Sequence, residues 1–173
     1  MHTFKPARTP FAPNARLTPI DGSLLSNPHE FRSLVGSLHY LTFTRPNLNF
    51  ATQQVCQFMS NPIDAHLIVA KRILRYVNGT LNSGVFLQPG PFSLSAFSNS
   101  KWAGDPFGRH FITGYIVYLG FNPITWSAKK QDTVSHSFTK SEYRALAATI
   151  AKLYWLRQVL KDLGIFLLVP PKL

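Results

Sequence analysis

The spacing of apolar residues changes twice along this chain, and this change restricts the fold more than any other feature. Between residues 28 and 78, apolar side chains recur every three or four positions, which predicts helices. From Gly84 to Ser127, short β-branched and aromatic stretches alternate with Gly, Pro and Asn, which predicts strands. From Glu142 to Leu163 the helical spacing returns. The sequence therefore predicts an α+β protein in which a short helical segment precedes a small sheet and a long helix.

The helical segment contains start and stop signals for three short helices. Asn27 is a capping residue, Pro28 suits a first helical turn, and Glu30 is an acid three residues after the cap. The first helix is expected to end before Pro46, because the residue before a proline is pushed out of the helical region. Apolar spacing and flanking Asn, Pro and Gly residues predict the other two helices, at 48–58 and 61–78.

Four later stretches have the composition of strands, and a long helix follows them. The stretches are 84–88, 93–99, 111–119 and 123–127. The connections between the last three are short, so these three are predicted to form an antiparallel meander. The helix has apolar residues at helical spacing and a Gly as its stop, and these residues are Tyr143, Leu146, Ile150, Leu153, Leu156, Leu160, Leu163 and Gly164.

These patterns divide the chain into three predicted segments. Residues 1–27 contain prolines that are incompatible with an amphipathic helix, so we expect an extended linker there. Residues 28–80 form the helical segment, and residues 81–173 form the mixed domain with the meander and the long helix. No apolar run approaches the roughly 18 residues that a membrane-spanning helix needs, so no membrane partner is expected.

The charge of the chain points to a polyanionic partner. Eighteen Lys and Arg stand against seven Asp and Glu, which gives a net charge of +11, and nucleic acid is the commonest partner of such a surface. The third helix carries three cations that could contact phosphates, although cations near a helix C-terminus also interact favourably with its dipole. A later group of cations and tryptophans could grip a nucleic-acid backbone, although the tryptophans also suit a core. The two groups are Lys71, Arg72 and Arg75, and Lys129, Lys130 and Arg144 with Trp102 and Trp126.

Residues for other chemistries are present without the spacing that those chemistries need. Cys56 is the single cysteine, so it has no partner for an internal disulfide or a zinc site, and it suits a reducing compartment. Ser135, His136 and Ser137 are adjacent, yet there is no Gly-x-Ser-x-Gly elbow and no acid evidently placed to orient the His. A solvated turn is the prediction there.

The chain resembles one known family along nearly its whole length. The helical segment reads FRSLVGSLHYLTFTRPNLNFATQQVCQFMSNPIDAHLIVAKRILRYVNGT, and it closely resembles the stretch after the polymerase in copia-type retrotransposon polyproteins, especially those of plants. The later part contains FSNSKWAGD, ITGYIVYLG, ITWSAKKQDTVSHSFTKSEYRALA and WLRQVLKDLGI, and it resembles the first half of the ribonuclease H domain of that family. The resemblance implies a truncated ribonuclease H-like domain, reverse transcription as the ancestral setting and an RNA:DNA hybrid as the substrate.

Three departures from the family's motifs concern its metal-binding carboxylates. The family's strand motif is Phe-Ser-Asp followed by Ala-Asp-Trp-Ala-Gly, and its first Asp binds metal; here Asn99 stands at that position and Lys101 at the second acidic position. The family's helix motif is Thr-Glu-Ala-Glu-Tyr, whose second Glu binds metal, and Glu142 matches it. The remaining carboxylates of the family are expected past Leu173.

The departures predict a site that cannot hold metal. The family's hydrolysis needs two divalent ions about 3.5 to 4 Å apart, held by several carboxylates. Asn99 is neutral, and Lys101 on the same strand face would place a positive charge where cations must bind. We expect no functional metal site and no cofactor, magnesium being the cofactor of the intact family. Glu142 is then either a vestigial metal ligand or, as we favour, part of a capping box with Thr139.

The sequence therefore predicts a catalytically inactive remnant of a reverse transcriptase and ribonuclease H polyprotein, with weak and non-specific affinity for nucleic acid. Two alternatives stay open: an adopted basic module that binds nucleic acid without catalysis, and an enzyme whose partner supplies the missing carboxylates. In the ribonuclease H fold of the family the first strand, which matches 93–99 here, lies in the middle of the sheet, and the strand that would pair with its other edge is expected past Leu173. We therefore expect an unpaired edge that favours self-association.

Overall fold

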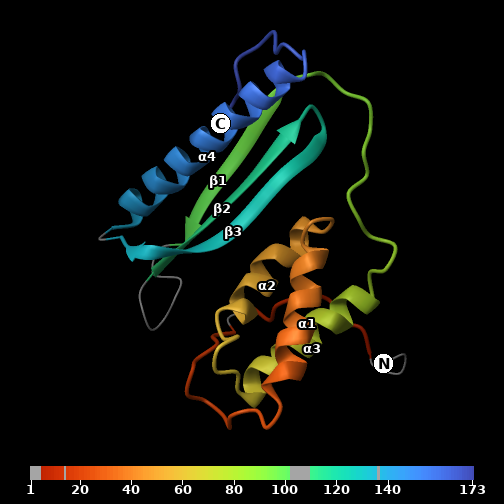
Figure 1. The fold of residues 1–173 in the computed structure, drawn as a ribbon, viewed down its shortest axis with the longest axis vertical. Helices are drawn as coiled ribbons and strands as arrows, with labels where there is room; N and C mark the ends of the chain where they lie inside the picture. The colour runs from red at the N-terminus through yellow and green to blue at the C-terminus, as the bar shows by residue number, and fades with distance from the viewer. Residues whose placement is uncertain (1–4, 14, 102–109, 136) are drawn as a thin grey trace. The chain divides into compact units, whose positions relative to one another are not determined.

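The computed structural model describes residues 5–13, 15–101, 110–135 and 137–173. The chain divides into two compact units, Met1–Gly84 and Val85–Leu173, which are called unit 1 and unit 2 below. Unit 1 is helical, and unit 2 combines a three-stranded antiparallel sheet with a long helix (Figure 1). The predicted α+β fold class is confirmed. None of the helices in the described ranges is both long and apolar enough to cross a membrane.

Unit 1 contains the three predicted helices. They are α1 (Pro28–Leu41), α2 (Asn49–Cys56) and α3 (Asp64–Asn78), with a short 3-10 turn (Pro46–Leu48) before α2. The Asn27 side chain caps α1 as predicted, because its Oδ1 accepts a hydrogen bond from the His29 backbone N–H at 3.2 Å. The buried faces of the helices meet in one apolar core, formed by Phe31, Val35, Leu38, Leu48, Ala51, Val55, Ala70, Ile73 and Val77.

His66 joins the start of α3 to the segment before α1. It is fully buried, and its Nδ1 accepts a hydrogen bond from the Ile63 backbone N–H at 3.2 Å. Its Nε2 lies 2.9 Å from the carbonyl oxygen of Thr18, and its ring stacks on Phe58 with 3.8 Å between centroids. Because Nδ1 accepts, Nε2 carries the proton and donates to Thr18. The stretch predicted as an extended linker is therefore tied to α3 at this point.

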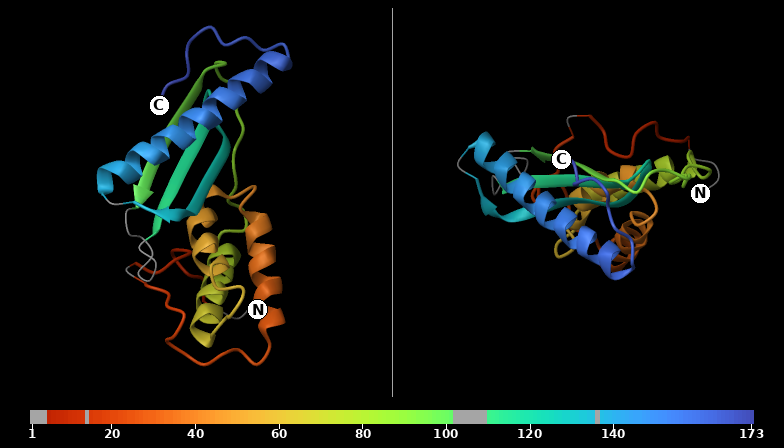
Figure 2. Two further views of the ribbon diagram at one scale, coloured as in Figure 1. Left: turned by 60° about the vertical axis from the view of Figure 1, so that its left-hand side comes forward. Right: turned by 90° about the horizontal axis from the view of Figure 1, so that it is seen from above.

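Unit 2 is a meander covered on one face by a helix. Strands β1 (Leu94–Lys101), β2 (His110–Leu119) and β3 (Asn122–Val134) lie in the order β1-β2-β3, and all neighbours are antiparallel. Helix α4 (Phe138–Asp162) lies along one face of this sheet (Figure 2). The core between them contains Leu94, Ala96, Val117, Leu153 and Leu160. The predicted meander and long helix are confirmed.

The strand predicted at Gly84 to Gln88 is wrong. This stretch has no ladder partner, and it is extended chain that leads toward β1. Gln88 instead pairs with one side chain: its backbone N–H donates to Asn122 Oδ1 at 2.8 Å, and Asn122 Nδ2 donates to its carbonyl oxygen at 2.8 Å. Pro89 and Pro91 follow directly, and proline cannot donate to a ladder, so apolar composition alone did not make a strand here.

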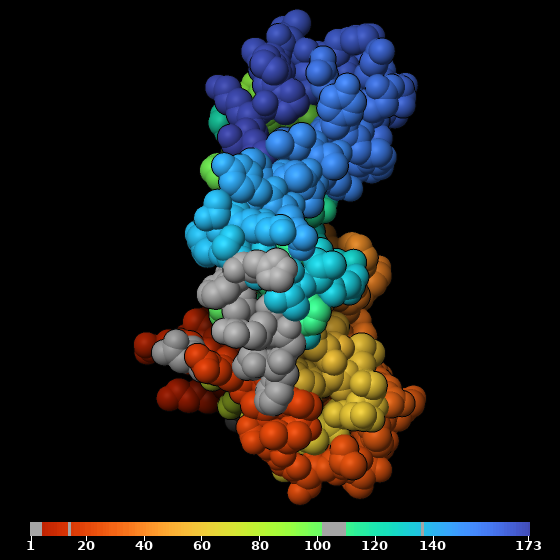
Figure 3. Space-filling view, turned by 90° about the vertical axis from the view of Figure 1, so that its left-hand side faces the viewer, coloured from red at the N-terminus to blue at the C-terminus, as the bar shows by residue number. Residues whose placement is uncertain are grey.

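The last residues of the chain return to the outer edge of β1. Lys172 forms a parallel bridge with Ser95, in which the Ala96 N–H donates to the Lys172 carbonyl at 2.9 Å and the Lys172 N–H donates to the Leu94 carbonyl at 3.0 Å. The surface of α4 and of the residues that follow it is drawn in blue in Figure 3. The β1 edge, which was expected to be open, is therefore paired at its first residues.

Candidate metal and nucleic-acid sites

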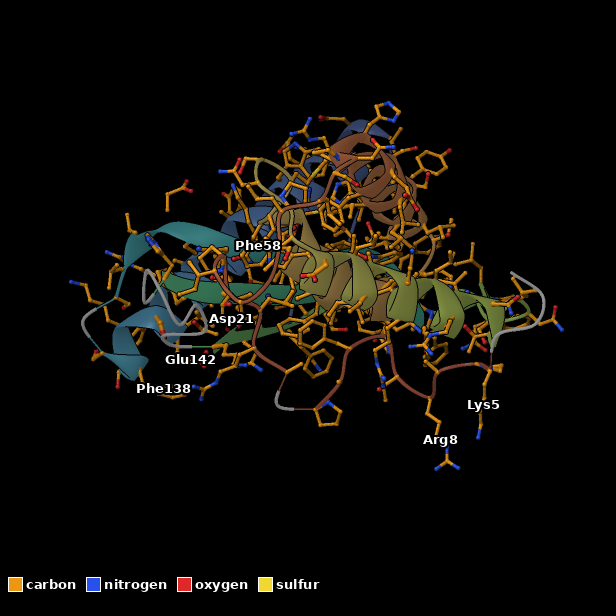
Figure 4. The ribbon with its side chains drawn as sticks, turned by 90° about the horizontal axis from the view of Figure 1, so that it is seen from below. Lys5, Arg8, Asp21, Phe58, Phe138 and Glu142 are labelled. Carbon is orange, nitrogen blue, oxygen red and sulfur yellow. The ribbon has the colours of Figure 1, made fainter. Side chains whose placement is uncertain are left out.

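The predicted metal-site residues meet where α4 begins beside the end of β1. Glu142 lies in the first turns of α4 (Figure 4), and its Oε1 accepts a hydrogen bond from the Ser100 backbone N–H at 3.1 Å. Asn99 and Lys101 flank Ser100 on β1, and both side chains are exposed while Ser100 is buried. The alternation of the strand places Asn99 and Lys101 on one face, as predicted. Glu142 thus lies next to the Asn99 position in space, although 42 residues separate it from Ser100.

Glu142 does not cap α4, so the favoured interpretation of this residue was wrong. The N-cap is Ser137, whose hydroxyl accepts a hydrogen bond from the Lys140 backbone N–H at 3.2 Å. Thr139 is already inside the helix, two residues after the cap. The hydroxyl of Ser137 is used as a cap, and His136 lies outside the described residues.

The described residues around Glu142 do not fit a pair of magnesium ions. Magnesium needs several hard, anionic oxygen ligands, and two ions need more carboxylates than one. Glu142 is a single carboxylate that already accepts from an amide, and Asn99 offers only a neutral carbonyl oxygen. In the part of the chain that the structure describes, no three His, Cys, Asp or Glu side chains gather where they could hold a metal ion.

The three predicted cations of α3 have different environments. Lys71 Nζ lies 4.0 Å from Glu30 Oε1, and both side chains are about half exposed, so this ion pair stabilises the fold little. Arg72 donates from Nη2 to the Thr9 hydroxyl at 3.0 Å. Arg75 is partly buried in the last turn of α3. Only Lys71 among the three is exposed, and its charge is partly balanced.

The cations predicted in unit 2 are not one patch. Lys129 pairs with Thr113 and Lys130 with Ile112, and successive strand residues point to opposite faces, so these two lysines lie on opposite faces of the sheet. Arg144 on α4 donates to the Thr133 hydroxyl at 2.8 Å and lies 5.8 Å from the centroid of the Phe111 ring. Trp126 is partly buried on β3, and Trp102 lies outside the described residues.

Sequence reasoning missed two features of this region. The first is the Ser100 amide, because a backbone donor that a distant carboxylate reaches leaves no local sequence signal. The second is Ser137 as the cap, for which a signal existed: it is a Ser followed by a helical apolar pattern. Thr139 and Glu142 have the spacing of a capping box, but both lie inside the helix that Ser137 caps.

The chain is similar to transposon polyproteins over nearly its full length. It is 48% identical over 172 residues to the retrovirus-related Pol polyprotein from transposon RE1 and 47% identical over 172 residues to that from transposon RE2, both of Arabidopsis thaliana. It is 32% identical over 174 residues to the retrovirus-related Pol polyprotein from transposon TNT 1-94 of Nicotiana tabacum. These alignments cover 99%, 99% and 95% of the chain.

The same alignments cover only 12% of the RE1 and RE2 polyproteins and 13% of the TNT 1-94 polyprotein. No protein-family model matches the chain, and no solved structure matches it. The chain spans about an eighth of the transposon polyproteins that it matches. The chain matches a fragment of the retrovirus-related Pol polyproteins of copia-type transposons.

Proposed function

We propose that this chain is a retrotransposon-derived segment with a ribonuclease H-like unit 2 that associates with nucleic acid without hydrolysing it. The observation that carries the proposal is the environment of Glu142. Its carboxylate accepts a hydrogen bond from the Ser100 amide. The neighbours of Ser100 on β1 are the neutral Asn99 and the cationic Lys101. In the ancestral reaction, the carboxylates of this region would hold two magnesium ions on the RNA strand of an RNA:DNA hybrid.

Electrostatics supports the loss of hydrolysis. Two divalent cations close together repel each other strongly, and several carboxylates must offset this repulsion. Glu142 supplies one negative charge, while Lys101 adds a positive charge one residue away from the amide that Glu142 accepts from. The same excess of cations favours attraction to phosphates, because the chain carries a net charge of +11.

A hybrid-cleavage assay tests the loss of hydrolysis. The full chain is incubated with an RNA:DNA hybrid labelled on the RNA strand, with magnesium and separately with manganese, and binding of the same hybrid is measured at two salt concentrations. We expect binding that weakens with salt and no cleavage above that of Glu142→Gln, which removes the carboxylate charge while keeping its size.

Magnesium-dependent cleavage that disappears in Glu142→Gln would contradict the proposal and favour an enzyme completed by a partner, such as a second copy of the chain. Absence of any salt-dependent binding would contradict only the proposed association with nucleic acid. Asn99→Asp with Lys101→Asp restores the family's two acids on β1 and serves as the matched variant in the cleavage assay.

The second candidate function is an adopted module whose purpose is nucleic-acid binding. It is favoured by the distribution of charge, because each unit separately has an excess of cations: unit 1 has eight Lys and Arg against three Asp and Glu, and unit 2 has ten against four. Affinity that persists at physiological salt would favour this module over a remnant, because non-specific phosphate contacts alone weaken steeply there.

A further inference from the structure

The sheet of unit 2 has a second face that α4 does not cover, called the outer face here. Leu94, Ala96 and Val117 point toward α4, since they pack with its apolar side chains. Strand residues alternate between faces, so Phe97, Asn99 and Lys101 on β1 point away from α4. Phe97 confirms this orientation, because 66% of its side chain is exposed.

The strand register arranges the outer face in three rows that cross the sheet. Because partners in an antiparallel register lie side by side, each row contains one residue from each strand. The first row is apolar and aromatic, the second consists of small or neutral residues, and the third has a lysine on each side of the buried Ile112. The rows are Phe97, Ile116 and Trp126, then Asn99, Gly114 and Ala128, then Lys101, Ile112 and Lys130.

The aromatic row offers ring surfaces to solvent. Phe97 packs edge to face against Tyr118, with 6.2 Å between ring centroids and an interplanar angle of 88°. This contact uses an edge of one of the two rings and leaves faces open. Tyr118, Ile116 and Trp126 are partly exposed beside it. Phe97, Ile116 and Tyr118 therefore form a small apolar and aromatic cluster on the outer face.

The charges of the outer face favour a polyanion. No Asp or Glu occurs in the register-paired residues 94–101, 112–119 and 122–130, and the first acid after them on β3 is the exposed Asp132, two residues past Lys130. Lys101 and Lys130 lie two rows from the aromatic residues, which is four residues or roughly 13 Å along each strand. Asn99 lies in the row between them, where the family's motif has an acid, so this row itself carries no negative charge, and the nearby Glu142 carboxylate accepts from the Ser100 amide.

We propose that the outer face binds single-stranded nucleic acid, with bases stacked on Phe97 and Trp126 and phosphates beside Lys101 and Lys130. Bases of a single strand expose their faces to aromatic side chains, whereas a duplex hides them within its own stack. The inference rests on the nucleic-acid affinity of the proposed function and is independent of the loss of hydrolysis.

Fluorescence anisotropy with labelled oligothymidylate and oligouridylate tests the proposal on the full chain. Phe97→Ala should weaken binding roughly tenfold or more, since stacking on one aromatic side chain contributes about that factor. Phe97→Tyr keeps the ring and should bind like the unchanged chain. The matched control is Tyr143→Ala, which removes a ring that is 68% exposed on α4, on the other side of the sheet, and should leave affinity unchanged.

Two further variants test the role of charge. Lys130→Gln should reduce the slope of log affinity against log salt by about 0.7, the value for one phosphate contact on a single strand. Asn99→Asp should weaken binding most at low salt, where repulsion is least screened.

Equal affinity of the unchanged chain and Phe97→Ala for the oligonucleotides would overturn the proposal. A loss of affinity in Tyr143→Ala as large as that in Phe97→Ala would also overturn it. A dimer that dissociates in Phe97→Ala, without a change in oligonucleotide binding, would show that the outer face contacts a second copy and would also overturn it. None of these three outcomes bears on hybrid cleavage, so failure here is distinguishable from failure of the proposed function.

Discussion

At the scale of single residues, the fold of unit 1 requires His66 in one protonation state. The neutral ring satisfies two partners at once, accepting from the Ile63 amide and donating to the Thr18 carbonyl. A protonated ring has donors on both nitrogens, so it would lose the bond from Ile63 and bury a charge. Burial accordingly lowers the pKa of His66 from its ordinary value of 6.5.

This environment predicts that unit 1 loses stability in acid. The unfolded chain binds a proton at His66 near pH 6.5, whereas the folded chain binds it only at lower pH. The contribution of His66 is therefore complete above about pH 6.5 and is lost as the pH falls, with a maximal slope of about 1.4 kcal/mol per pH unit. Urea unfolding followed by circular dichroism at pH 7.5 and 5.5 measures this loss of stability.

His66→Gln should be less stable at pH 7.5 but should lose less of its remaining stability on acidification than the unchanged chain. His39→Gln, at an exposed site, should lose as much stability on acidification as the unchanged chain. A loss on acidification that is equally large in His66→Gln would assign the pH dependence to other groups.

Glu142 marks the limit of what the sequence predicts about the candidate site. The motif predicted its helix and its nearness to Asn99, and both hold in the structure. Its actual hydrogen-bond partner is a backbone amide 42 residues away, which depends on how α4 packs against β1 and not on any local pattern. The capping prediction failed because it was made from local spacing alone.

At the scale of elements, the start of α4 offers a direct comparison of two neighbouring hydroxyls. Ser137→Ala removes the acceptor for the Lys140 amide and should destabilise unit 2 by about 1 kcal/mol, the usual cost of losing such a cap. Thr139→Ala removes a hydroxyl that lies within the helix and should cost much less. Thermal unfolding followed by tryptophan fluorescence compares the two, and an equal loss in both would contradict Ser137 as the cap.

The elements of the sheet show why strands are harder to predict than helices. Each helix of unit 1 has its own start signal and apolar stripe, so its position was predicted from its own residues. A strand also needs a neighbour, and β1, β2 and β3 are neighbours because their connections are short. Gly84 to Gln88 has similar composition but no neighbour, and Asn122 takes the hydrogen bonds of Gln88 instead.

At the scale of the whole molecule, the two units have separate cores, and this predicts that they unfold separately. Ile73 is fully buried in the core of unit 1, so Ile73→Ala should destabilise that unit by about 2–5 kcal/mol. All three tryptophans belong to unit 2, so their fluorescence reports on that unit alone, whereas circular dichroism reports on the helices of both.

Ile73→Ala should therefore lower the midpoint seen by circular dichroism and leave the fluorescence midpoint unchanged. Val117→Ala, in the core of unit 2, should shift the fluorescence midpoint. A fluorescence midpoint that falls equally in Ile73→Ala would show that the two units unfold as one.

The bridge between Ser95 and Lys172 has a consequence for the order in which the chain is made. β1 can pair with β2 soon after both have been synthesised, because they are close in sequence. Its outer edge must wait until roughly 75 more residues have been added, which takes several seconds at about 5–20 residues per second. During that interval the amide of Ala96 faces solvent. A nascent chain held on the ribosome before Lys172 emerges would present this edge to chaperones, and a released chain would cover the first residues of the edge.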